Sequence, residues 1–271
     1  MYEQSILIII KTHPQHHKTM QLDFIGNAIS TLNNNATEQP RFWDNSFNLI
    51  PVGRPRLNTQ KVDKFFNSIS QEEIAEYSKY WNSVVPNNSS EVFQRWLFAF
   101  MSVHTSWRSN INGYLMIRNW WEWLNKPEEL ERRIVESGAG LHKNRTKFIT
   151  AFAEHYWANI EFYNKQEDES WVEFRDRLVD KVLGLGMAKV SFALEMVYPA
   201  LAEVTCMDTH LFQLFGLDQT KDSKQYHKME QHWIAMCKMW NVSSYVARCI
   251  WWDRNQGYTD SRYWSFVLEK E

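Results

Sequence analysis

Apolar residues recur every three or four positions along most of the chain from about Met20 onward, which is the spacing of one helix face. In one such segment Phe93, Trp96, Leu97 and Phe100 form a single apolar stripe. Segments in which apolar and polar residues alternate, as they do in strands, are nearly absent. The pattern and its caps predict helices over residues 70–80, from 89 or 90 through 100, and over 127–136, 144–162, 170–182, 187–197, 208–215, 221–240 and 242–255.

The expected helix ends carry their own signals. Ser70 followed by Glu73 is a capping box, Pro127 suits a first helical turn, and Asp208 can cap a short helix. Residues 37–57 contain three prolines and little helical repeat, so we expect a long loop there. The fourteen tryptophans are spread along the chain, and we expect most of them in the core. The sequence therefore predicts an all-α protein.

Composition narrows the class of protein. With 271 residues, 44% of them hydrophobic, and a formal charge of −2, the chain can bury a sizeable core and is not expected to be disordered. A pI near 6.5 argues against coating nucleic acid by bulk charge, so any DNA contact must be local. We expect no transmembrane helix and no signal peptide, because the apolar runs are short and the start lacks a basic stretch.

The three cysteines, Cys206, Cys237 and Cys249, are too few for a disulfide framework, and their spacing fits neither zinc nor iron–sulfur ligation. We therefore expect no metal site, no cofactor and a reducing, cytoplasmic location.

One turn between two predicted helices has a spacing that suits phosphate binding. Gly184 and Gly186 allow a tight backbone turn and leave no side chains that would keep a phosphate away. The helix that follows offers free amide N–H groups and the positive end of its dipole. Leu183, Gly184, Leu185 and Gly186 are thus candidate DNA-binding residues, and a tight helical turn without a ligand is the alternative interpretation.

Four landmarks follow one another along the chain. They are a loop over residues 100–106, a helix start over 140–147, the glycine hairpin leading to Lys189, and a turn over 206–210 with Asp208 nineteen residues after Lys189. In this order they resemble the helix-hairpin-helix (HhH-GPD) superfamily of DNA glycosylases. The resemblance covers about residues 92–216. It implies a two-lobed helical bundle in which residues 1–88 pack with a C-terminal lobe over 201–271, residues 89–200 form the other lobe, and the site lies in the cleft between them.

The resemblance also assigns chemistry to two residues. Asp208 would stabilise the positive charge that develops on the sugar and orient or deprotonate the nucleophile. Lys189 would attack the sugar carbon if it is buried beside Asp208, whereas water is the nucleophile if Lys189 faces solvent. The residues alone allow a simpler interpretation, in which Asp208 is a helix cap and Lys189 a solvated helix lysine.

Four further residues are candidates for DNA contact. His104 and Trp107 lie in the loop that resembles the family's DNA-inserting segment, where a planar side chain can fill the gap left by a flipped base. Lys143 and Arg145 cluster at a helix start, where a phosphate would account for cations that oppose the helix dipole. The alternatives are a helix-end histidine, a packed tryptophan and ordinary surface charge.

The chain departs from the family pattern in three respects. The hairpin lacks the usual proline, and the iron–sulfur cluster of several branches has no cysteines to hold it. The family's lysine commonly stands where this chain has Ala188, one residue before Lys189. One residue on a helix is about 100° of rotation, which leaves open whether the amine faces the cleft.

Three functions are compatible with these features. The first is a monomeric DNA glycosylase that excises a modified or damaged base from double-stranded DNA. The second is suggested by phage-encoded relatives, which would attach amino acids or polyamines to hydroxymethyl-pyrimidine bases in the host cytoplasm. The third is a DNA-binding module that keeps only the hairpin.

Overall fold

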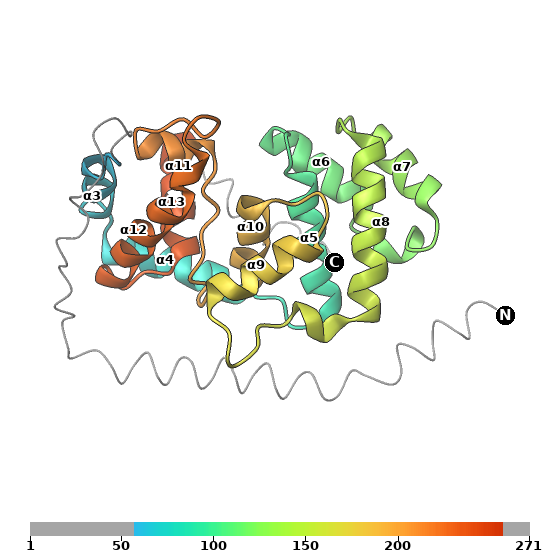
Figure 1. Cartoon of the computed structure of the whole chain (residues 1–271), viewed down its shortest axis with the longest axis horizontal. Coiled ribbons are helices and arrows are strands. Elements are labelled where there is room, and N and C mark those ends of the chain that lie inside the picture. The colour runs from blue at the N-terminus through green and yellow to red at the C-terminus, as the bar shows by residue number, and fades with distance from the viewer. Residues whose placement is uncertain (1–56, 257–271) are drawn as a thin grey trace. The chain divides into compact units, whose positions relative to one another are not determined.

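The computed structural model describes residues 57–256, and every regular element in this range is helical (Figure 1). The longer helices are α4 (Gln71–Ser83), α5 (Ser89–Met101), α6 (Trp107–Ile117), α7 (Pro127–Glu136), α8 (His142–Ala158), α9 (Trp171–Lys181), α10 (Met187–Val197), α12 (Tyr226–Met239) and α13 (Ser244–Gln256). The shorter ones are α3 (Gln60–Phe66), α11 (Thr209–Leu214) and the 3₁₀ helices η2 (Trp120–Glu122), η3 (Ile160–Tyr163) and η4 (Ser223–Gln225). The predicted all-α class is confirmed.

Leu57–Val85 and the described residues from Val92 onward form one compact unit, and residues 86–91 are grouped with another. The expectations for the region near Met20, and nearly all of the loop expected over 37–57, lie outside the described residues. Within the described range, no helix has both the length and the apolar character needed to cross a membrane.

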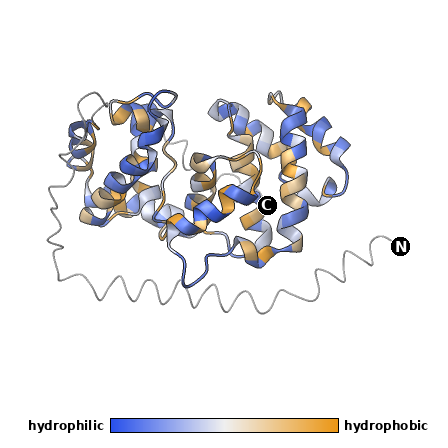
Figure 2. Cartoon of the chain, viewed as in Figure 1, coloured by the Kyte–Doolittle hydropathy of each residue, from blue (hydrophilic) through white to orange (hydrophobic). Residues whose placement is uncertain are grey.

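Helices that are distant in the sequence pack against one another. α13 contacts α4, α10 and α12, while α7 contacts α6 and α8. The Tyr77 hydroxyl of α4 donates a 2.7 Å hydrogen bond to the carboxylate of Asp253 on α13. Hydrophobic positions run in stripes along the helices (Figure 2), as expected of elements that bury one face. α13 is therefore the element to which both the beginning of the described range and α10 attach.

Aromatic side chains fill much of the core. Trp81, Trp96, Trp123 and Trp233 are buried, and each ring packs against other rings. Trp121 is the opposite case, since 58% of its surface is exposed. The four buried tryptophans therefore agree with the predicted core position, and Trp121 does not.

One predicted helix is in fact divided. The segment expected over 144–162 is α8 followed by η3, with a break at Asn159. In a continuing helix the Asn159 backbone N–H would bond to the carbonyl of His155. Instead the Asn159 side chain donates to that carbonyl at 3.1 Å, and the backbone N–H bonds to Tyr156. Competition of a short polar side chain with the backbone explains the error.

The structure differs from the sequence prediction at two further places. The sequence predicts no helix over residues 107–117, with Trp107 in a loop. In the structure Trp107 begins α6, because the Ser106 hydroxyl accepts the Ser109 N–H and caps the helix. The helix expected from residue 221 begins at Tyr226. Before it, the Asp218 carboxylate accepts backbone N–H groups and holds a separate turn.

Of the two glycines in the hairpin between α9 and α10, only Gly184 has a backbone conformation and surroundings that require glycine. Gly184 has φ +86°, and a Cβ there would lie 2.3 Å from the ring of Phe148 on α8. Gly186 is the N-cap of α10 with φ −85°, and a Cβ there would meet nothing within 4 Å. The two leucines of the hairpin have opposite environments. Leu185 is buried, whereas Leu183 is 59% exposed at the tip. Close packing on α8 therefore shapes the turn.

We predict that Gly184→Ala destabilises the protein by about 1–3 kcal/mol, because alanine is strained at positive φ and its methyl group would displace Phe148. Gly186→Ala is the matched control, and we expect it to change the free energy of unfolding by less than about 0.5 kcal/mol. Chemical denaturation of both variants measures the difference. Equal effects of the two substitutions would contradict the role given to Gly184.

Candidate active site

The segment that carries Asp208 crosses the interior between α10 and α11 without a neighbouring strand. Its backbone N–H groups are bonded instead to buried side chains of other helices. These side chains are Glu230 for the amide of Thr205 (2.8 Å), Glu195 for that of Cys206 (3.3 Å) and the Tyr226 hydroxyl for that of Met207 (3.3 Å). The path of this segment is thus determined by tertiary contacts, because buried backbone amides must find partners.

Both glutamates that bond this segment are paired with buried arginines. The Arg248 Nε donates to Glu195 at 2.9 Å, and the Arg175 Nη1 donates to both oxygens of Glu230 at 2.6 Å. Burial raises the pKa of Glu195 to about 8, although the Arg248 charge opposes that shift. Burial likewise raises the pKa of Glu230 above its ordinary value, and Arg175 acts against the shift. Each pair places a carboxyl group beside a guanidinium in the interior, where a lone charge would be costly.

Asp208 is both a helix cap and a pocket residue. Its Oδ1 accepts the backbone N–H groups of His210 at 3.0 Å and Leu211 at 3.1 Å, which caps α11. Its Oδ2 accepts no hydrogen bond from the described residues, and the side chain is half-buried. The capping interpretation is correct, and it leaves the second oxygen available for chemistry.

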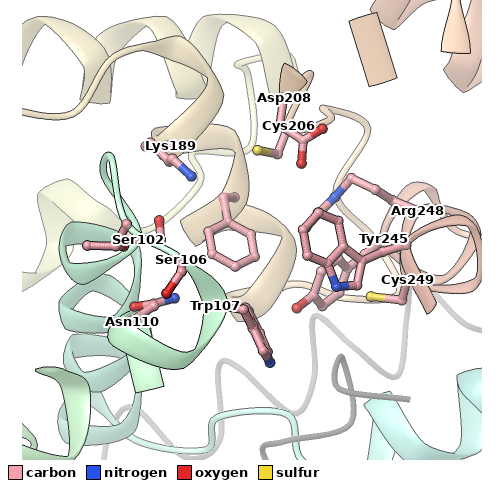
Figure 3. A pocket seen from close by; sticks show the side chains of 13 residues that line it. Ser102, Ser106, Trp107, Asn110, Lys189, Cys206, Asp208, Tyr245, Arg248 and Cys249 are labelled. Carbon is pink, nitrogen blue, oxygen red and sulfur yellow. The ribbon is translucent and has the colours of Figure 1, made fainter. Parts of the chain in front are cut away.

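A pocket opens beside Asp208. Its wall is made by the turn after α5, the start of α6, one face of α10, the segment with Asp208 and one face of α13. Lys189 and Asp208 both line it, and Figure 3 shows the amine and the carboxylate directed toward the same hollow. Lys189 therefore does not stand on the solvent face of α10, despite its shift by one residue from the family's usual position. Its Nζ lies 5.6 Å from the centre of the Phe192 ring.

Cys206 also lines the pocket, next to Asp208. Burial raises the pKa of its thiol to about 12, so the thiol stays protonated at neutral pH and is a poor nucleophile. Lys189 is the stronger candidate for that role. Within residues 57–256, no three His, Cys, Asp or Glu side chains come together in a way that could hold a metal ion.

The two candidates in the loop after α5 have different environments. His104 is exposed, at the tip of the turn, with φ +49°. Trp107 is half-buried on the pocket wall, and its ring packs against Phe98 at 5.4 Å and against Trp252 at 6.3 Å. His104 therefore lies at the surface, whereas Trp107 packs against other aromatic rings in the pocket wall.

Arg145 does not stand at the surface, contrary to the expectation of a phosphate contact. It is 4% exposed, and its guanidinium donates to four backbone carbonyls. They belong to Gly140 (2.8 Å), Phe100 (3.1 Å), Met101 (2.9 Å) and Val103 (2.5 Å). Arg145 therefore holds the end of α5 and the turn that presents His104. Lys143, two residues earlier, is exposed and remains a candidate for DNA contact.

Several pocket residues were not among the site residues predicted from the sequence, chiefly those of α13 and Asn110 of α6. The sequence contains one indication of a buried charged pair, because Glu195 and Arg248 are charged residues on helical faces that are otherwise largely apolar. Charged residues are rarely buried unless they are paired. Their pairing could not be inferred, since 53 residues separate them.

A glycine hairpin that leads into a pocket with a lysine and a capping aspartate is the arrangement of helix-hairpin-helix DNA glycosylases. The sequence profile of one family, described as 8-oxoguanine DNA glycosylase, matches residues 70–242. This match spans more than half of the chain, and the chain belongs to that family. No curated protein sequence matched the chain.

Solved structures with a similar fold carry the same description. The 8-oxoguanine DNA glycosylase of Thermotoga maritima is 15% identical with a TM-score of 0.60, over 74% of this chain and 99% of that one. The enzyme of Methanocaldococcus jannaschii is 16% identical with a TM-score of 0.54, over 74% and 90%. Its complex with a 15mer DNA containing 8-oxoguanine has a TM-score of 0.57 at 16% identity, over 73% and 97%. At this identity the likeness establishes the fold.

We predict that Glu195 makes the protein less stable as the pH rises from about 4.5 to 8. In this window the unfolded chain has lost the Glu195 proton while the folded protein keeps it, so unfolding releases a proton and the free energy of unfolding falls. Glu195→Gln has no such proton. The stability difference between wild type and Glu195→Gln should therefore change by a few kcal/mol across the window, whereas an exposed control, Glu154→Gln, should follow wild type. Parallel pH profiles for Glu195→Gln and wild type would contradict the assignment.

We predict that Arg145→Met lowers the free energy of unfolding by about 2–4 kcal/mol, because buried carbonyls lose their donor. Lys143→Met removes an exposed cation on the same helix and should cost less than about 0.5 kcal/mol. Urea denaturation of the two variants measures the contrast. An Arg145→Met variant of unchanged stability would show that the guanidinium has another role.

Proposed function

We propose that the protein is a DNA N-glycosylase that removes a damaged base from a nucleotide flipped out of the duplex. The observation that carries the proposal is that Lys189 and Asp208 line one pocket, with one Asp208 oxygen free of hydrogen bonds from the described residues. An enzyme that cuts a base from its sugar needs a hollow for the everted nucleotide and a negative charge near the sugar. This site offers both.

Asp208 is suited to stabilise the cationic sugar. The α11 cap keeps the carboxylate in place through Oδ1, so Oδ2 can face the sugar ring without a change of rotamer. A preorganised charge of this kind acts in the transition state at little cost in reorganisation.

Lys189 is proposed as the nucleophile. Its nitrogen forms a bond to C1′ while the glycosidic bond breaks, and the departing base takes the bonding electrons and then a proton. Loss of the amine proton and opening of the sugar ring at O4′ then give a Schiff base between Lys189 and the sugar. From that species the enzyme can also break the strand, which is the lyase activity implied by the resemblance.

DNA would be held by local features. The exposed tip at Leu183 and the start of α10 after Gly186 would contact a phosphate, and Lys143 would contact another. His104, exposed at the tip of its turn, would enter the gap left by the flipped base. These contacts need no basic surface, which agrees with the formal charge of −2.

The first base to test is 8-oxoguanine. It is named in the description of the matching family, and it is the base in the DNA of one solved relative. Mass spectrometry of the DNA bases after incubation with the protein distinguishes the possible reactions. A glycosylase releases a free base, a base-modifying transferase increases the mass of a base, and a binding module leaves the bases unchanged.

We predict that borohydride traps the protein on a duplex containing 8-oxoguanine, because it reduces a Schiff base to a stable amine. Lys189→Ala should abolish the adduct, whereas Lys228→Ala, which removes an exposed lysine of α12, should leave it unchanged. Asp208→Asn should slow base release by about 100-fold or more. Undiminished turnover by Asp208→Asn would refute its catalytic role, and base release by Lys189→Ala without trapping would assign the attack to water.

A further inference from the structure

Arg248 of α13 brings a buried positive charge to the wall of the pocket. The residue is 7% exposed, and it lines the pocket together with Lys189 and Asp208. Its Nη2 is buried and has no hydrogen-bond partner among the described residues. Buried polar groups in native proteins nearly always have a partner, and a charged group is especially costly to leave without one. The steps proposed for Lys189 and Asp208 leave this cation unused.

The guanidinium of Arg248 has a fixed orientation. Its Nε donates to Glu195 of α10 at 2.9 Å, and its Cζ lies over the rings of Phe192 (5.0 Å) and Tyr245 (5.2 Å). These contacts come from two helices and hold the planar group on both its edge and its faces. A charge that is fixed in advance can stabilise a transition state without the cost of reorganisation.

The pairing with Glu195 leaves most of the Arg248 charge in place at neutral pH. Burial raises the pKa of Glu195 to about 8, so the carboxyl group is largely protonated at pH 7. Arginine keeps its proton under the same conditions. Charges also act more strongly in a pocket wall from which water is excluded than they do in solution. The α13 side of the pocket is therefore positive.

The charges around the pocket match the charge separation of glycosidic bond cleavage. As the bond breaks the sugar becomes positive, which suits Asp208, and the departing base becomes negative. Lys189 Nζ and Arg248 Cζ lie 5.6 Å and 5.0 Å from the centre of the same Phe192 ring, and Figure 3 shows the two side chains on opposite sides of the hollow. An attacking group and a departing group occupy opposite sides of the carbon, so a base displaced by Lys189 moves toward the wall that carries Arg248.

We propose that Arg248 is a catalytic residue that stabilises the negative charge on the departing base. The inference rests on the proposed function and concerns the step in which the C1′–N bond breaks. The electron pair of that bond goes to the base, and Arg248 stabilises the resulting anion by its charge while it keeps its own proton. The base then takes a proton, and the Lys189 amine loses one in the same sequence, so the step balances without a further reactant.

The test separates base departure from the rest of the reaction. Single-turnover base release and duplex affinity are measured on DNA with 8-oxoguanine, and borohydride trapping is measured on DNA with a preformed abasic site. The proteins are wild type, Arg248→Met and Arg254→Met. Arg254 is an exposed arginine of the same helix that bonds to Glu73 and Ser68, and it provides the matched control. Thermal unfolding verifies that each variant is folded.

Arg248→Met should slow base release by about 100-fold, because it removes one preorganised charge from the transition state. Its affinity for the 8-oxoguanine duplex should stay within about threefold of wild type, since the base is neutral before the bond breaks. Trapping on the abasic duplex should also stay within about threefold, since no base departs there. Arg254→Met should behave as wild type. Unchanged base release by Arg248→Met, or an equally large loss of affinity or of trapping, would overturn the assignment.

Arg248→Ala adds a readout that a merely structural role would not change. The shortened side chain leaves room for a small cation, so millimolar guanidinium chloride should raise base release by this variant about tenfold over sodium chloride at the same ionic strength. Equal rates in the two salts would count against a role of the charge.

Failure of this inference is distinguishable from failure of the proposed function. Base release by wild type that Arg248→Met matches overturns the role of Arg248 alone. A wild type that releases no base refutes the proposed function and this role with it. If wild type releases the base without trapping, the comparison of rate with affinity decides the role of Arg248.

Discussion

The site depends on how the protein satisfies the backbone amides of residues 205–207. This segment passes through the interior with no strand beside it, and its N–H groups would be costly to leave unpaired. Glu195 of α10, with Glu230 and Tyr226 of α12, accepts these hydrogen bonds. The segment then ends at Asp208, whose position relative to α10 follows from contacts with α10 itself. α10 and the segment that carries Asp208 are thus joined by a buried hydrogen bond as well as by the chain.

Buried charges in this protein mainly organise backbone. Glu195 and Glu230 hold one side of the pocket, and Arg145 holds the turn after α5 on another side by donating to four carbonyls. A charged group can make several strong hydrogen bonds to main-chain atoms, which fixes irregular segments that have no regular partner. Arg175 and Arg248 lie beside the two glutamates, so a negative charge on either carboxyl group is compensated.

Hydrogen bonds from backbone N–H groups to a carboxylate also explain why Asp208 can cap α11 and still present an oxygen to the pocket. A carboxylate has two oxygens, and the α11 cap occupies one of them. The cap and the proposed catalytic role are therefore compatible in this residue, because the cap holds the carboxylate in a fixed orientation. At Lys189 the geometry is set by helix rotation and by Phe192, since the amine lies against that ring at the pocket wall.

The sequence by itself determined the helical class, most helix positions and the hairpin, because hydrophobic spacing, caps and glycines act through neighbours within a few residues. Asp208 and Lys189 became candidates through the resemblance of the hairpin and the turn over 206–210 to the glycosylase superfamily. Only the tertiary structure decided that Lys189 faces the pocket, that Arg145 is buried, and that Asn110 and α13 complete the wall. Those facts depend on contacts between segments dozens of residues apart, and the pairing of distant side chains leaves no periodic signal in a single sequence.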